Sequence, residues 1–72
     1  MDRTPKLGTS DQILEAALAR EKEAYQFYSD LLAQTQVDFI RELLEKLRDE
    51  EQRHVRMIEN MVEHLTLGHE PA

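Results

Sequence analysis

The segment FIRELLEKLRDEEQRHVRMIENMVEHL, residues 39–65, decides the fold. Its apolar residues recur three or four positions apart, and it contains neither glycine nor proline. One row of this pattern runs through Ile40, Leu44, Leu47, Ile58, Met61 and Leu65. The spacing predicts a long amphipathic helix from about residue 37 to about residue 67, ended by Gly68 and Pro71.

A second helical pattern precedes this segment, from about residue 11 to about residue 34. Ser10 is the predicted N-cap, and Asp11 suits the first turn because a carboxylate there meets the positive end of the helix dipole. Two neighbouring apolar rows follow: Leu14, Leu18, Tyr25, Tyr28 and Leu32 form one, and Ile13, Ala17, Ala24, Phe27 and Leu31 the other. The periodicity fades at residues 34–36, where we expect the turn, with Thr35 as a cap.

The length of the chain limits how it can be stabilised. With 72 residues and no cysteine, it is expected to form one domain, residues 1–72, without a disulfide. Chains this short usually need a metal or a second subunit. Helices joined by a short turn lie antiparallel, and one hairpin leaves much of its apolar surface in water. We therefore predict an all-α fold, an antiparallel two-helix hairpin that dimerises into a four-helix bundle, with loose chain ends.

Composition narrows the classes of partner. The net charge of −6 argues against nucleic acid and anionic membrane, which attract basic patches. No apolar run approaches the ~18 residues of a membrane span, and MDRTPKLGTS at residues 1–10 does not resemble a signal peptide. Together with the lack of cysteine, these features predict a cytoplasmic protein.

Three ionisable side chains interrupt the apolar rows. Glu21 lies in the row of the first helix, and Glu51 and His54 lie in the row of the second. In an antiparallel hairpin, residues equally far from the turn lie side by side. The midpoint of 21 and 51 is 36, and that of 21 and 54 is 37.5, both at the expected turn. Because residues three apart share a helix face, all three groups should meet at one level.

This combination of side chains predicts a metal site. One hairpin offers two carboxylates and one imidazole, so two hairpins offer four carboxylates and two imidazoles. That is the ligand set of carboxylate-bridged two-metal bundles. Oxygen and imidazole nitrogen suit iron, with manganese as an alternative. We predict Glu21, Glu51 and His54 as metal ligands and catalytic residues, with two metal ions per site shared by two chains.

The remaining tyrosine, glutamate, histidine and methionine residues near these rows are not predicted to bind the metal directly. Tyr28 lies two turns after Glu21 and is predicted to donate a hydrogen bond to a ligand carboxylate, while Tyr25, one turn away, is the alternative. Core packing is the competing interpretation for both tyrosines. A surface position is expected for Glu23, Glu50, His64 and His69, and a core position, in place of copper ligation, for Met57 and Met61.

Two segments carry a family resemblance. AREKEAYQFYSDLLAQ, residues 19–34, resembles the first helix of rubrerythrin-like ferritins, in which a ligand glutamate precedes a tyrosine by seven positions, as Glu21 precedes Tyr28. ELLEKLRDEEQRH, residues 42–54, resembles their second helix with its Glu-x-x-His motif. The thirty-residue separation of Glu21 and Glu51 is similar to that in encapsulated ferritins. Those are single hairpins that build the site between subunits, and the resemblance implies an encapsulin shell as partner. TLGHEPA, residues 66–72, is a poor match to the tail that docks in such a shell.

Three functional hypotheses follow. The resemblance implies a ferroxidase that oxidises Fe(II) to Fe(III) with oxygen or peroxide for iron storage or detoxification. The first alternative is a rubrerythrin-like peroxide reductase with the same ligands. The second is a non-catalytic dimerisation module, in which Glu21, Glu51 and His54 act as buried polar groups that specify pairing.

Overall fold

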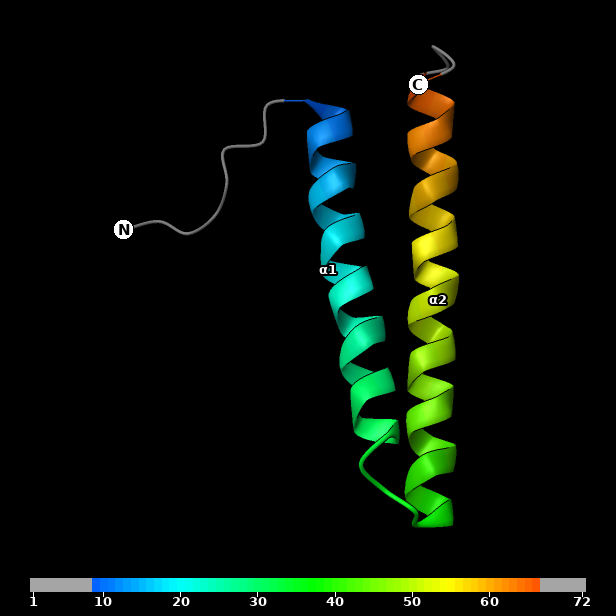
Figure 1. Ribbon diagram of the computed structural model, residues 1–72. Helices are drawn as coiled ribbons and strands as arrows, with labels where there is room; N and C mark the ends of the chain where they lie inside the picture. Colours follow the sequence, from blue (N-terminus) through cyan, green and yellow to red (C-terminus); the bar gives the residue numbers. More distant parts are fainter. Residues whose placement is uncertain (1–8, 67–72) are drawn as a thin grey trace, which may run out of the picture.

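The computed structural model describes residues 9–66 as two α-helices, α1 (Ser10–Leu32) and α2 (Asp38–Thr66). The helices lie side by side, joined at one end by residues 33–37 (Figure 1). The start of α1 and the end of α2 lie together at the other end (Figure 1). The predicted antiparallel all-α hairpin is confirmed. Gly68, Pro71 and His69, to which the sequence assigned roles, lie outside the described residues.

The N-cap of α1 is Thr9, and the prediction of Ser10 was wrong. Thr9 has extended backbone angles, and its hydroxyl oxygen accepts a hydrogen bond from the backbone N–H of Gln12 at 3.3 Å. Ser10 already has helical geometry as the first residue of α1. Both residues have a hydroxyl that could cap a helix, so local sequence cannot choose between them.

Arg41 fastens the turn to the end of α1. Its guanidinium Nη1 donates hydrogen bonds to the carbonyl oxygens of Leu32, at 2.6 Å, and Thr35, at 2.9 Å. The Thr35 hydroxyl accepts a hydrogen bond from the backbone N–H of Val37 at 3.2 Å, one residue before α2 begins. A helix C-terminus leaves carbonyl groups unpaired, and a cation there also suits the helix dipole. These hydrogen bonds stabilise the turn, which contains neither glycine nor proline.

The interface between the helices is narrow. Leu32 and Leu44, 5% and 8% exposed, are the buried apolar residues of the described chain. The first row of α1 faces α2, since Leu14, Leu18, Tyr25 and Tyr28 are half-buried alongside buried Leu32. Leu44, Leu47, Ile58 and Leu65 of α2 are buried or half-buried in the same way.

The row predicted along α2 does not face α1 as a whole. Ile40, His54 and Met61 are exposed, while Val55 and Val62, outside that row, are half-buried. The cause is geometric: one neighbouring helix covers only one flank of a wide apolar stripe. The row predicted from a 3.5-residue period therefore combines residues that face α1 with residues that face away from it.

One flank of the hairpin, which we call the open face, is left uncovered and carries exposed apolar side chains. Helical spacing places on it the exposed apolar side chains Ile13 and Phe27 of α1 and Leu43, Met57 and Met61 of α2. Helical spacing places Ala17 and Ala24 on the same side of α1. The opposite flank of the hairpin is mostly polar. Within residues 9–66, neither helix has the length and apolar character needed to cross a membrane.

Candidate metal centre

Glu21, Glu51 and His54 lie together between the helices. One potential ligand atom from each lies within 4.8 Å of the other two. His54 Nδ1 is 3.4 Å from Glu21 Oε2 and 3.6 Å from Glu51 Oε2. The structure therefore brings together the three residues selected from the sequence, and their role as ligands stays a prediction.

The helices place this cluster at their midpoints. α1 runs from residue 10 to residue 32, so Glu21 is its middle residue. α2 runs from residue 38 to residue 66, so its middle residue is 52, between Glu51 and His54. Packing the two helices side by side brings the midpoints to one level. The cluster therefore rests on rigid helix and not on loop.

Exposure changes across the cluster. The Glu51 side chain is 18% exposed, that of Glu21 29% and that of His54 48%. Glu51 Oε2 is fully buried and has no hydrogen-bond partner among the described residues. A buried polar oxygen without a partner is unfavourable unless another group satisfies it. A cation held by these oxygens and the imidazole nitrogen would do so, and the donor set fits iron. His54 borders the open face.

The two carboxyl groups perturb each other's proton affinity. A hydrogen bond with Glu21 and burial raise the pKa of Glu51. The hydrogen bond with Glu51, opposed by burial, is the main cause that lowers the pKa of Glu21, and His54 adds to the lowering. Because the two carboxyl groups lie close together, the neutral form of Glu51 and the charged form of Glu21 are favoured relative to isolated glutamates. A cation bound between the two carboxylates would relieve their mutual repulsion.

Comparison with known proteins places the chain. The rubrerythrin family model matches residues 3–72. The chain belongs to the rubrerythrin family. Rubrerythrin domains are ferritin-like and bind iron, which agrees with a cluster of two glutamates and a histidine. No curated protein and no solved structure matches the chain.

Tyr28 of this rubrerythrin-family chain packs its ring against Phe27. The ring centroids lie 5.4 Å apart at an interplanar angle of 63°, an edge-to-face contact. Within residues 9–66, the structure gives Tyr28 no hydrogen bond to Glu21 or Glu51, so its predicted role toward a ligand carboxylate stays a prediction. Glu23, Glu50 and His64 are exposed, as expected.

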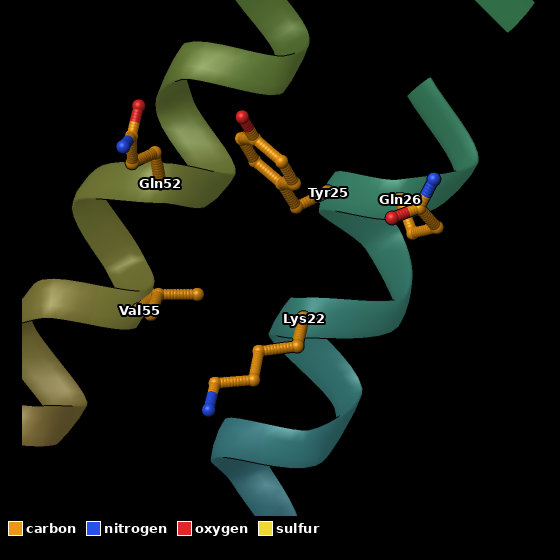
Figure 2. Close-up of a pocket in the computed structure, with 5 residues that line it drawn as sticks. All are labelled: Lys22, Tyr25, Gln26, Gln52 and Val55. Carbon is orange, nitrogen blue, oxygen red and sulfur yellow. The ribbon is translucent and has the colours of Figure 1, made fainter. Parts of the chain in front are cut away.

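Sequence reasoning missed a groove on the polar flank of the rubrerythrin-like hairpin. This groove of about 270 Å³ is lined by Lys22, Tyr25, Gln26, Gln52 and Val55. Figure 2 shows the Tyr25 ring and the Val55 side chain both turned into the space between the helices. The signal in the sequence is that Lys22 and Gln26 are one turn apart and flank Tyr25. Tyr25 therefore borders the polar flank, away from the open face.

Proposed function

We propose that two copies of this chain form one two-iron centre that oxidises Fe(II) to Fe(III). The observation that carries the proposal is the meeting of Glu21, Glu51 and His54 within 4.8 Å, with Glu51 Oε2 left unpaired. Family membership supports iron as the metal. The reaction balances when two Fe(II) ions each give up one electron and O₂ takes up the two electrons with two protons, which yields hydrogen peroxide.

One hairpin supplies half of the necessary ligands. A two-iron carboxylate bundle uses four carboxylates and two imidazoles, whereas the cluster contains two and one. The occupant that completes the set is a second copy of the chain, because a two-fold axis doubles each group. The exposed apolar residues of the open face lie beside the cluster and supply the surface for this contact.

The residues of the chain have three tasks in this reaction. The carboxylates of Glu21 and Glu51 bind the substrate Fe(II) ions and compensate their charge as it rises by one. Neutral His54 donates a nitrogen lone pair, which orients the ion against the carboxylates. Binding of Fe(II) favours the charged carboxylate of Glu51, whose pKa is raised in the metal-free chain. Apolar residues of two open faces exclude bulk water around the site.

Analytical ultracentrifugation with iron analysis tests this proposal. Protein purified without chelator and loaded anaerobically with Fe(II) is expected to sediment as a dimer or larger, with two irons per pair of chains. A folded monomer that holds iron would overturn the shared site. If the folded protein took up no iron, the remaining hypothesis would be the non-catalytic dimerisation module.

The oxidant is a separate question with its own measurement. Stopped-flow mixing of the Fe(II)-loaded protein with O₂, and in parallel with H₂O₂, follows the appearance of Fe(III) absorbance. If the protein is a ferroxidase, O₂ is expected to oxidise the bound iron in the parent, and the Glu51→Ala substitution is expected to abolish this oxidation. Rapid oxidation by H₂O₂ with little by O₂ would instead support the peroxide reductase.

A further inference from the structure

The open face of α2 has a symmetric arrangement of side chains about its midpoint. Leu43 precedes residue 52 by nine positions and Met61 follows it by nine. Glu50 precedes it by two positions and His54 follows it by two. Helical spacing puts all four on the same side of α2, and all four are exposed. A second α2 laid antiparallel across the first therefore matches apolar with apolar residues and carboxylate with imidazole.

We propose that α2 packs antiparallel on α2 of a second copy, about a two-fold axis level with Gln52, and that Glu50 of each chain accepts a hydrogen bond from His54 of the other. The proposal rests on the two-chain site of the proposed function. It adds the orientation of the chains and gives Glu50 a role as a positioning residue for His54.

The imidazole has a nitrogen available for this contact. His54 Nδ1 is the atom that faces the carboxylates of Glu21 and Glu51. Its other nitrogen, Nε2, has no hydrogen-bond partner among residues 9–66. Histidines that bind metals usually donate this second N–H to a carboxylate or carbonyl, which fixes the ring and the tautomer. Glu50 of the same chain lies one turn away on α2, yet the structure contains no hydrogen bond or ion pair between the two side chains.

The alternative orientation places unlike groups together. In this alternative, the two-fold axis that relates the two copies runs parallel to the helices. The turns of both hairpins then lie at the same end of the bundle, and α2 of one copy faces α1 of the other. Residues whose numbers sum to 72–75 lie at one level in this hairpin, as Glu21 does with Glu51 and His54. Arg20 of the second copy would then face His54, so a guanidinium that only donates would meet an imidazole N–H. Glu50 would face Ala24, the residue at its own level on the open face of α1.

The proposed axis also suits α1. Glu21, the middle of α1, lies at the level of residue 52, so both helix pairs overlap along their full length. Ala17 of one copy then lies opposite Ala24 of the other, since both are about equally far from the axis. Small side chains at these positions let the two α1 helices approach closely.

Cross-linking of single-cysteine variants tests the orientation, and the natural chain contributes no thiol. Met61→Cys is mixed with Leu43→Cys in one sample and with Ile13→Cys in another, and each is treated with a short bis-maleimide. All three positions are exposed in the single hairpin. The proposal predicts a heterodimeric product for Met61→Cys with Leu43→Cys. If Met61→Cys were cross-linked only to Ile13→Cys, the proposed orientation would be wrong. It would also be wrong if Met61→Cys were cross-linked to neither variant although the parent sediments as a dimer. Both results would leave the shared metal site of the proposed function intact.

Mixed dimers carrying two different affinity tags test the role of Glu50. One dimer pairs Glu50→Ala with His54→Ala, and the other pairs the parent with the Glu50→Ala/His54→Ala double variant. Both contain one Glu50 and one His54, but these residues lie on different chains in the first dimer and on the same chain in the second.

Titration with Co(II), followed by its visible absorbance, measures metal affinity without turnover. The proposal predicts that the first mixed dimer binds about tenfold or more tightly than the second, the usual effect of a residue that orients a ligand. If the two mixed dimers bound Co(II) with equal affinity, or if the second bound it more tightly, the proposed contact between Glu50 and His54 of different chains would be wrong. A monomeric parent in the sedimentation test overturns the proposed function and this inference together.

Discussion

The Glu21 carboxylate and the His54 imidazole, on opposite helices, lie 3.4 Å apart. This contact joins the middles of the two helices and defines the level at which the candidate iron site lies. Glu51 lies on the same level, 3.6 Å from the same imidazole nitrogen. The position of the site therefore depends on how the two helices pair. Its residues lie far from the turn, so they can be substituted without changing the turn.

Removing a predicted ligand should abolish most Fe(II) oxidation. Glu51→Ala and His54→Ala each delete two groups from a two-chain site, because both copies carry the change. Stopped-flow absorbance measures the rate, and circular dichroism checks that the helices persist. Glu45→Ala and His64→Ala are matched controls, since both residues are exposed on α2 away from the cluster. If the controls lost as much activity as the cluster variants, the assignment of ligands would be wrong.

Glu21→Leu separates metal binding from a purely structural role. Without metal, this change should stabilise the protein by ~1 kcal/mol, because it removes one of two close carboxylates and adds apolar contact. With Fe(II), the parent should gain much more stability than the variant, since only a bound ligand shifts the unfolding equilibrium. Urea unfolding with and without Fe(II) measures both effects. Glu15→Leu, at an exposed site on α1, is the control. A variant that still binds two irons per pair of chains would exclude Glu21 as a ligand.

Acid should release the metal. A histidine must be neutral to bind, so protonation of His54 competes with the metal. Fe(II) affinity should be lower at about pH 5.5 than at about pH 7.5, because an imidazole nitrogen that carries a proton cannot bind a metal ion. Anaerobic titration at several pH values measures the affinity, and His54→Gln should flatten the dependence. An affinity of the parent that stays constant over this range would argue against imidazole ligation.

The metal-free protein should show a second pH dependence, of opposite sign. The raised pKa of Glu51 means that its stabilising contribution is complete below the ordinary carboxyl value of 4.5 and is lost as the pH rises through the raised pKa. Glu21, with its lowered pKa, keeps its contribution above 4.5 and loses it only as the pH falls through the lowered value.

The test is urea unfolding of chelator-treated protein between about pH 4.5 and pH 7. The free energy of unfolding should fall over this range, and Glu51→Gln should lessen the fall because amides do not titrate. Glu42→Gln, exposed on the same helix, should leave the profile unchanged. An identical fall in Glu51→Gln would assign the dependence to other groups.

Arg41→Met should destabilise the hairpin by about 2 kcal/mol, since hydrogen bonds to a charged donor contribute more than neutral ones. The side chain donates to the carbonyl groups of Leu32 and Thr35, which lose their partner in the variant. Thermal unfolding measures the loss, and Arg53→Met at an exposed position of α2 is the control. Equal stability of the two variants would mean that the turn does not depend on Arg41.

The sequence by itself determined the helices and the three residues of the candidate site. Helical periodicity is local, so apolar spacing and the absence of glycine and proline were sufficient to predict both elements. The level of Glu21, Glu51 and His54 followed from counting outward from the turn, because a short link forces antiparallel packing. The N-cap was assigned one residue late, since Thr9 and Ser10 offer equivalent hydroxyl groups.

Only the tertiary structure decided which flank of each helix is covered. Periodicity gives a stripe but not the direction from which a neighbour approaches, so Val55 is half-buried and Met61 exposed against the predicted row. It also decided that Arg41 closes the turn and that the contact with Glu21 raises the pKa of Glu51. These features depend on distances between atoms far apart in the chain, and such distances exist only after the helices have packed.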